Sequence, residues 1–240
     1  MRMIKRYLFV LYGIIVIIAI VGSLFLSYTW SPEVFKPVIY KGIEIKLPEP
    51  RYDSGISIEE AILKRRSKRE YSQEALSMED VSQLLWAAQG ITGPRGFGRA
   101  APSAGGTYPL EIYVVTGRVE GLEAGVYHYN PKEHSITRIR TGDFREELQE
   151  AGLNQKWIGN AAIDLVFTAV YERTTHVYGD RGIRYVHLEA GHAAQNVYLQ
   201  AVSLNLGAVV VGAFDDKKVI ETINATGDET PLYIIPIGKI

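Results

Sequence analysis

The chain has 240 residues, of which 47% are hydrophobic and 22% are charged, and it contains no cysteine. This composition is that of a folded globular protein. The lack of cysteine excludes disulfide scaffolds, cysteine-ligated zinc or iron–sulfur centres and a cysteine nucleophile. The formal net charge of −1 argues against nucleic-acid binding.

The N-terminus predicts a membrane anchor. Arg2, Lys5 and Arg6 precede 20 uncharged residues, Tyr7 to Leu26, and about 20 apolar residues suffice for a helix to cross the hydrocarbon core. A cleaved signal peptide or a buried core helix are the alternatives, but the run exceeds the usual signal core of about 7–15 residues and lacks a clear cleavage site. We predict a single-pass transmembrane helix within residues 1–30. Basic flanks stay inside, so the N-terminus would be cytoplasmic and the folded domain would face outward from the cell membrane.

An extended linker is predicted over residues 31–56, because four prolines fall within this segment and proline fixes φ and lacks an amide donor. A short edge strand fits within Val38–Leu47. The folded domain is then predicted to span residues 57–240.

Helices are predicted where capping residues precede apolar residues at helical spacing. Ser57 and Ser77 each have an acidic residue three positions later, and Gly90 is placed to end the second helix. Further helices are predicted at Asp143–Ala151, Arg181–Asn205 and Asp215–Asn224.

Strands are predicted from β-branched and aromatic content, at Leu110–Thr116, Val126–Tyr129, Ser135–Arg140, Ile163–Tyr171, Ala208–Phe214 and Leu232–Ile237. Helices and strands do not alternate regularly, which favours an α+β fold over a doubly wound sheet.

Five cations and one hydroxyl lie within the six residues Lys64–Arg69. Cations at a helix end are favoured by the helix dipole, so this segment could be an ordinary solvated terminus. It could also be an anion site, because arginine forks and a serine hydroxyl suit phosphate oxygens.

A glycine-rich loop precedes the predicted strand at Leu110. It is neither a P-loop nor a dinucleotide fingerprint, because no Gly-Lys-Ser/Thr follows and no helix opens after a strand. A serine nucleophile elbow at Ser103, with His192 as base, would need a strand before the serine and a helix after it, whereas this loop precedes a strand. A tethered hydrolase is therefore the least favoured of three hypotheses.

No metal site is predicted. His187 and His192 are five residues apart, which separates them by about 140° around a helix. Gly212 and Gly238 follow apolar runs, where glycines either form turns or let a flat ligand approach, and Lys239 could add a cation for phosphate.

Five segments occur in this order: LKRRSKREY, PSAGGTYPLEIYV, YGDRGIRYVHLEAGHAAQN, LGAVVVGAF and PLYIIPIGK. Together they resemble the nitroreductase-like flavoproteins, and among these the SagB-type dehydrogenases. The resemblance runs from Ser57 to Ile240. It implies a nitroreductase-like fold with a central, mostly antiparallel sheet flanked by helices, and a homodimer that binds FMN at its interface.

The resemblance also implies which residues contact the flavin. The RRSxR segment would hold the phosphate and ribityl chain, the PSAGG segment of the partner subunit and the late glycine would approach the ring, and a final lysine would reach the phosphate. The implied residues are Arg65, Arg66, Ser67, Arg69, Pro102, Ser103, Ala104, Gly105, Gly106, Val211, Gly212, Ala213 and Lys239. Gln195, in the GHxxQN signature, would help to position the long helix at the interface.

The expected function is that of an FMN-dependent oxidoreductase that transfers a hydride or electrons between small molecules. Azoline-oxidising relatives carry a Lys-Tyr pair where this chain has Val177 and Tyr178. A valine cannot abstract a proton, so the prediction stops short of azoline oxidation. Tyr178 is the candidate catalytic acid or substrate contact, or else a packing aromatic. The alternative function is a non-catalytic, tethered flavin- or partner-binding module.

Overall fold

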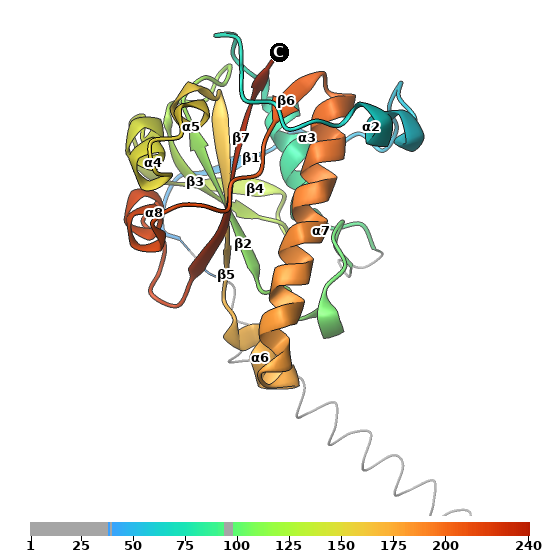
Figure 1. The fold of residues 1–240 in the computed structure, drawn as a ribbon, viewed down its shortest axis with the longest axis vertical. Helices are drawn as coiled ribbons and strands as arrows, with labels where there is room; N and C mark the ends of the chain where they lie inside the picture. The colour runs from blue at the N-terminus through green and yellow to red at the C-terminus, as the bar shows by residue number, and fades with distance from the viewer. Residues whose placement is uncertain (1–37, 39, 94–97) are drawn as a thin grey trace, which may run out of the picture. The chain divides into compact units, whose positions relative to one another are not determined.

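The structure is a computed structural model that describes residues 38, 40–93 and 98–240 (Figure 1). Val38–Ile240 forms one compact unit. The predicted membrane span and the first part of the predicted linker lie outside the described residues. None of the helices in the described ranges is long and apolar enough to cross a membrane.

A seven-stranded sheet forms the centre of the described domain, with the strand order β1-β4-β3-β2-β5-β7-β6. Each pair of neighbouring strands in this order is antiparallel, as the resemblance implied. The strands are β1 Glu44–Lys46, β2 Leu110–Thr116, β3 Gly125–Asn130, β4 Ser135–Thr141, β5 Ile163–Ala169, β6 Leu206–Ala208 and β7 Thr230–Lys239.

Helices cover both faces of this sheet, which confirms the α+β prediction (Figure 1). Successive side chains of β5 point to opposite faces of the sheet, so both faces carry apolar residues that need a covering helix. Leu165 and Phe167 belong to the core under α3 and α7, whereas Val166 belongs to the core under α4, α5 and α8. The helices are α2 Ile58–Lys64, α3 Met78–Gln89, α4 Arg145–Ala151, α5 Lys156–Asn160, α6 Glu172–Tyr178, α7 Arg181–Ser203 and α8 Asp216–Ile223.

The predicted helix starts are confirmed at their caps. The Ser57 hydroxyl accepts the Glu60 amide at 3.1 Å, and Ser77 and Asp80 form a reciprocal capping box. The long helix α7 buries a stripe of small residues, including Ala190 and Ala193, against the sheet. Small side chains let this helix lie close to the strands, so its position is well fixed.

The predicted strand Ala208–Phe214 is wrong. The strand β6 instead ends at Ala208. Beyond it, the Val209 amide donates to the Pro236 carbonyl at 3.3 Å, and an isolated bridge joins Val211 to Ile234. One cause is that Pro236 has no amide with which to return a hydrogen bond to Val209. The Val210 amide points away from β7 and donates to the hydroxyl of Tyr198 at 2.8 Å. The short helices α5 and α6 were not predicted.

The described part of the predicted linker packs on the domain. β1 pairs with β4 at one edge of the sheet, in agreement with the edge strand expected within Val38–Leu47. Farther along, the buried side chain of Gln83 pairs with the backbone of Arg51, accepting its amide at 2.8 Å and donating to its carbonyl at 3.0 Å.

Candidate functional site

The cationic segment after α2 lies beside the end of β6. Ser67 forms a parallel bridge with Ala208, and the Lys68 amide donates to the Ala208 carbonyl at 2.9 Å. This pairing brings together two segments that are about 140 residues apart in the chain and that the sequence resemblance assigns to the same ligand.

Tyr198 of α7 connects these two segments. The Arg65 guanidinium lies 5.1 Å from the centre of its ring, a cation–π contact. Its hydroxyl lies 3.0 Å from the Ser67 hydroxyl and accepts the Val210 amide at 2.8 Å. Sequence reasoning missed Tyr198, because an aromatic residue in a buried helix usually signals packing. We call Arg65, Ser67, Arg69 and Tyr198 the cationic cluster.

The cations of this segment differ in direction. Arg66 turns back and donates to the carbonyls of Leu63 and Arg65, at 2.9 and 2.7 Å, so it caps the end of α2. Arg69 instead lies over the ring of Trp157, 5.2 Å from its centre. Lys239 lies 3.5 Å from a carboxylate oxygen of Glu74.

A cavity of about 440 Å³ adjoins Arg69, lined by residues 67–72 and Ile240. Tyr71 is anchored there, with its hydroxyl 2.8 Å from the Lys68 carbonyl, and burial raises its pKa. A Cβ atom on Gly238 would lie 2.8 Å from Tyr71, so this glycine makes room for the tyrosine. Gly212 is different, because a Cβ there would approach nothing closer than 3.8 Å, which leaves its backbone open.

The PSAGG segment forms a tight turn that receives a tyrosine. Gly105 and Gly106 have φ of 60° and 66°, which glycine adopts most readily. A Cβ atom on Gly105 would lie 2.6 Å from the hydroxyl oxygen of Tyr178. The two features that the sequence singled out separately, this loop and Tyr178, therefore meet.

A buried ionic network holds α6, which carries Tyr178. Arg173 lies 2.5 Å from one carboxylate oxygen of Glu111, and His128 lies 2.7 Å from the other. Arg173 also donates to the Tyr108 carbonyl at 3.0 Å, which ties α6 to the glycine loop. Burial opposes the charge of Glu111, yet the hydrogen bond from His128 and the Arg173 guanidinium bring its pKa below the usual value.

A second buried carboxyl, Glu189 of α7, lies directly behind the loop. This residue is 3% exposed, and its carboxylate accepts a hydrogen bond from the Gln89 amide at 3.3 Å. Burial, only partly offset by the polar and cationic groups around it, raises the pKa of Glu189 to about 7. We call Ser103, Gly105, Tyr178 and Glu189 the glycine-loop cluster.

The two clusters lie at opposite ends of α7 (Figure 1). Tyr178 packs edge-to-face on Tyr185 near the start of the helix, with ring centres 5.1 Å apart. Tyr198 belongs to the other cluster, and 13 helical residues separate Tyr185 from Tyr198, a rise of about 20 Å. Glu189, which also belongs to the glycine-loop cluster, is nine residues from Tyr198 on the same helix, a rise of about 14 Å.

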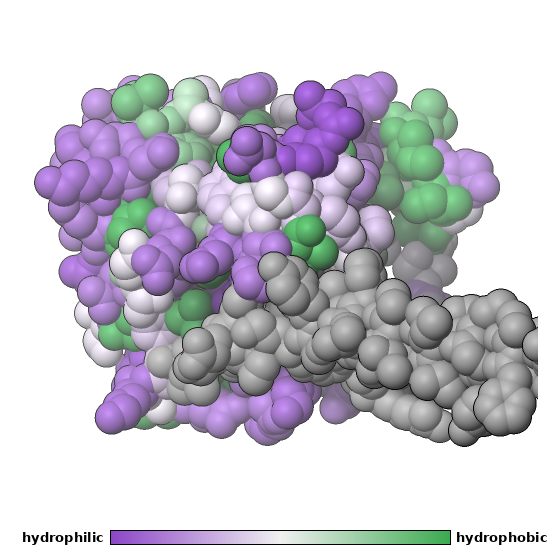
Figure 2. All heavy atoms as spheres, turned by 90° about the horizontal axis from the view of Figure 1, so that it is seen from below, coloured by the Kyte–Doolittle hydropathy of each residue, from purple (hydrophilic) through white to green (hydrophobic). Residues whose placement is uncertain are grey.

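Between the clusters, α7 presents an exposed face with apolar residues. Leu188 is 53% exposed, and a Cβ on Gly191 would meet no atom within 4 Å. Gln195 is also exposed on this helix. Hydrophobic side chains in the view from below form a group at the right-hand edge and are otherwise scattered among hydrophilic ones (Figure 2).

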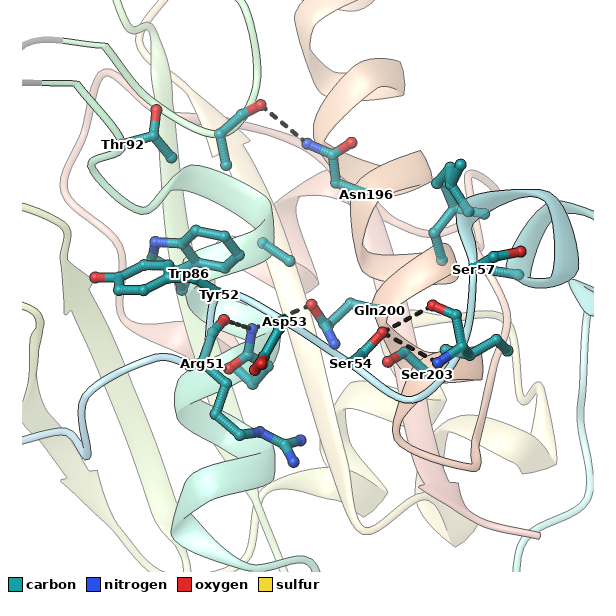
Figure 3. A pocket seen from close by; sticks show the side chains of 17 residues that line it. Arg51, Tyr52, Asp53, Ser54, Ser57, Trp86, Thr92, Asn196, Gln200 and Ser203 are labelled. Atoms are coloured by element: carbon teal, nitrogen blue, oxygen red, sulfur yellow. Dashed lines mark hydrogen bonds between the residues drawn. The ribbon is translucent and has the colours of Figure 1, made fainter.

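A further cavity of about 490 Å³ lies between α2, α3, α7 and residues 51–58 (Figure 3). Tyr52 packs edge-to-face on Trp86 at its wall, with ring centres 5.6 Å apart. Gln83 and Gln200 bridge the two long helices at 3.2 Å. None of the predicted site residues lines this cavity.

Two other sequence interpretations can be compared with the geometry. His187 bonds to the Tyr171 hydroxyl at 2.5 Å, and the described residues contain no group of three or more histidine, aspartate or glutamate side chains placed to hold a metal. The Ser103 hydroxyl accepts the Tyr108 amide at 2.9 Å. This contact gives no support to the Ser103–His192 hydrolase.

A model of the Nitroreductase family matches residues 62–239. Over 197 residues the chain is 50% identical to a nitroreductase-like protein of Methanocaldococcus jannaschii, a match that covers 82% of this chain and 96% of the relative. It is 28% identical over 154 residues to the microcin B17-processing protein McbC of Escherichia coli, covering 62% of this chain and 57% of McbC.

Among solved structures, a nitroreductase-like protein of Ralstonia eutropha is similar, with a TM-score of 0.72 and 32% sequence identity. The match covers 85% of this chain and 95% of that one. The range matched by the family model contains both the cationic cluster and the glycine-loop cluster.

Proposed function

This chain belongs to the nitroreductase family, as its motifs indicated, and we propose that it is an FMN-dependent oxidoreductase that transfers a hydride or electrons between small organic molecules. The observation that carries the proposal is the cationic cluster, in which two distant segments and Tyr198 are joined by hydrogen bonds beside an open backbone at Gly212.

The cationic cluster suits the FMN phosphate. That group carries about two negative charges near neutral pH, and arginine forks with a serine hydroxyl are well matched to its oxygens. Arg65, Ser67 and Arg69 would bind the phosphate and ribityl chain, with Lys239 nearby. Val211–Ala213 would then lie along the ring, because this segment continues from the strand end that pairs with Ser67.

A homodimer would complete the site. Within one subunit, Tyr178 packs near the start of α7, about 20 Å along the helix from Tyr198, and a second subunit would bring its own glycine-loop cluster to the flavin. Two antiparallel copies of α7 related by a two-fold axis would bring each cationic cluster to the partner's glycine loop. The exposed Leu188 and the open approach at Gly191 support α7 as the contact face.

The flavin supplies the hydride chemistry when it is bound, while the protein supplies orientation and electrostatics. Because Gly105 has no side chain, the Tyr178 hydroxyl can lie against the loop backbone. Tyr178 is 37% exposed. We propose that this hydroxyl contacts the substrate or delivers a proton to it.

A non-catalytic, tethered flavin- or partner-binding module is the second candidate. Val177 favours it, since this residue stands beside Tyr178 on α6 and has no group that can take a proton. Bound flavin that dithionite reduces and a quinone or nitro compound reoxidises would support the enzyme. Bound flavin that no donor reduces would favour the module.

We also propose that Tyr7–Leu26 anchors the protein in the cell membrane, with the N-terminus cytoplasmic and the folded domain outside. The proposal rests on the 20-residue uncharged run and its basic flank. Protease protection of the full chain in sealed vesicles would test this orientation.

The proposed function is tested by the absorption spectrum of the full-length protein, purified in detergent and supplied with FMN. We expect a bound flavin that is released as FMN on denaturation. Arg69→Ala should weaken FMN binding about tenfold or more, because a hydrogen bond between charged groups contributes about 1.5–3 kcal/mol.

Arg66→Ala is the matched control, since Arg66 caps α2 instead of joining the cationic cluster, and it should leave FMN affinity within about twofold of the wild type. A protein that binds no flavin would overturn the proposal. Equal losses in the two variants would contradict the assignment of the phosphate site.

A further inference from the structure

Arg99 and Tyr108 close the glycine loop from its two ends. Arg99 stands before the PSAGG segment and Tyr108 after it, and the Arg99 guanidinium lies over the Tyr108 ring, 4.3 Å from its centre. A cation over an aromatic face is attracted by the negative charge of the π-system. A Cβ atom on Gly106 would lie 3.8 Å from the Cε2 atom of the same ring. The stacked pair therefore lies beside the turn of the loop.

The backbone of Tyr108 is strained. Its φ is 45°, in the left-handed region that a bulky residue rarely adopts. The next residue is Pro109, and a residue before proline prefers extended backbone. Of the described non-glycine residues with positive φ, Tyr108 alone precedes a proline. Such a conformation persists only where the surroundings impose it, so the contacts of Tyr108 must hold it in place.

Three contacts hold Tyr108, each by a different part. The Ser103 hydroxyl accepts the Tyr108 amide at 2.9 Å, and Arg173 of α6 donates to the Tyr108 carbonyl at 3.0 Å. These two hydrogen bonds fix the peptide groups on either side of the residue. Arg99 fixes the side chain. Removing the Arg99 guanidinium would therefore release the ring and leave both backbone contacts in place.

Arg99 is itself oriented by a buried relay. Its Nη1 atom donates to the Gln89 Oε1 atom at 3.0 Å, and the Gln89 Nε2 atom donates to the Glu189 carboxylate at 3.3 Å. Gln89 of α3 is fully buried. A side-chain amide that accepts on one side and donates on the other satisfies both neighbours in one orientation only. The two long helices, α3 and α7, thereby keep the guanidinium over the Tyr108 ring.

We propose that Arg99 is a positioning residue that acts through Tyr108 and holds the glycine loop in the strained shape that receives a flavin ring. The inference rests on the proposed function, because it takes the ring to lie against this loop. A loop that already has its binding shape loses less free energy when the ligand binds. Without the guanidinium, Tyr108 should relax toward the extended backbone that Pro109 favours, and the turn at Gly105 and Gly106 should move with it.

The test measures the affinity of the full-length protein, purified in detergent, for riboflavin by quenching of flavin fluorescence. Riboflavin lacks the phosphate, so its affinity reports on the ring and the ribityl chain alone. Arg99→Met should weaken riboflavin binding about twofold to thirtyfold, the range that a cation–π contact spans between exposed and desolvated sites. Arg99→Lys keeps a cation near the Tyr108 ring and should recover part of this loss.

A double-variant cycle tests whether Arg99 acts through Tyr108. Tyr108→Gly removes the ring and adopts a positive φ without strain, so Arg99→Met should cause no further loss of riboflavin affinity in this background. Equal losses from Arg99→Met with and without the Tyr108 side chain would overturn the inference and leave the proposed function intact.

A second comparison does not depend on the folding of Arg99→Met. Tyr108→Phe keeps an aromatic ring under the Arg99 guanidinium, whereas Tyr108→Gly does not. Tyr108→Phe should therefore bind riboflavin at least about twofold more tightly than Tyr108→Gly. Equal affinities of these two variants would show that the stacked ring does not shape the loop, and the inference would be wrong.

Arg140→Met is the matched control, because the Arg140 guanidinium also lies over an aromatic ring, 3.8 Å from the centre of Phe144. Arg140 stands on β4 and donates to the Thr222 carbonyl at 2.6 Å, outside the glycine loop. Arg140→Met should lower the melting temperature but leave riboflavin affinity within about twofold of the wild type. A loss of affinity as large as that of Arg99→Met would mean that both act through general stability, and would overturn the inference.

FMN separates the inference from the proposed phosphate site. Arg99→Met should weaken FMN and riboflavin binding by the same factor, because it leaves the cationic cluster unchanged, whereas Arg69→Ala should weaken FMN binding far more than riboflavin binding. If Arg99→Met left riboflavin affinity at the wild-type value, only the inference would be wrong. If the wild type bound neither flavin, the proposed function and this inference would fall together.

Discussion

The two ends of α7 carry clusters of opposite character. At one end, the cationic cluster consists of exposed and half-buried side chains beside the backbone pairing of Ser67 with Ala208 at the end of β6. At the other end, the glycine loop and α6 are fixed by charges that are almost fully buried, with the Arg173 and Glu111 side chains 7% and 9% exposed. The charges of the first cluster are open to an anionic ligand, whereas the charges behind the glycine loop are already paired within the protein.

This difference predicts where substitutions act. Exposed charges contribute little to folding because water and salt screen them, so changes in the cationic cluster should affect ligand affinity more than stability. Removing one partner of a buried pair leaves an uncompensated charge, so changes behind the glycine loop should affect stability first.

The largest expected effect is that of Arg173→Met, which keeps much of the side-chain volume and removes the cation beside Glu111. We expect a loss of about 3–5 kcal/mol in the free energy of unfolding, measured by denaturant unfolding of the flavin-free protein. Arg69→Met makes the same change at an exposed position and should cost less than about 1 kcal/mol. Equal losses in the two variants would show that the contrast between the two ends does not hold.

The sequence predicted the sheet well for reasons visible in single strands. β2 and β5 are buried along their whole length, and both are rich in β-branched and aromatic residues, the composition that predicts a strand. The shift of β6 and the helix α6 were missed because each depends on contacts across the fold. Pro236 of β7 has no amide to pair with Val209, and the Glu111 carboxylate anchors Arg173.

Part of the candidate site could also be predicted from the sequence. The motif residues of the cationic segment and of the loop were found, but their separation along α7 follows only from the three-dimensional arrangement. Glu189 gave a signal that was not used. It stands between Val186 and Ala193 on the buried stripe of α7, where a carboxylate needs partners.

A smaller effect is expected at the turn of the glycine loop. Gly105→Ala meets two penalties, since its φ is 60° and its new Cβ would lie 2.6 Å from the Tyr178 hydroxyl. Gly106→Ala is the control, because its φ is 66° but its nearest neighbour would be 3.8 Å away. Left-handed backbone costs a non-glycine residue about 1–2 kcal/mol, and Gly105→Ala should cost more than this.

The contact with Tyr178 can be separated from the backbone strain by a double variant. Tyr178→Phe removes the hydroxyl oxygen, so it should recover the excess cost of Gly105→Ala and recover nothing in Gly106→Ala. Thermal unfolding of the six proteins of these two cycles, wild type included, measures both outcomes. The same loss with and without the Tyr178 hydroxyl would mean that the loop and Tyr178 are not in contact.

The smallest expected effect is a loss of FMN affinity at the cationic cluster, at the other end of α7. Tyr198→Phe keeps the ring under Arg65 but removes the hydroxyl that links Ser67 to the Val210 amide. Because each neutral hydrogen bond contributes only about 0.5–1.5 kcal/mol, FMN affinity should fall by about threefold to tenfold. Tyr233→Phe offers a comparison, since Tyr233 lies on β7 near Gly212 outside the cationic cluster, and it should leave affinity unchanged. If Tyr198→Phe lowers the melting temperature without changing FMN affinity, Tyr198 only packs α7 against the sheet, and the cationic cluster does not depend on it to hold its shape.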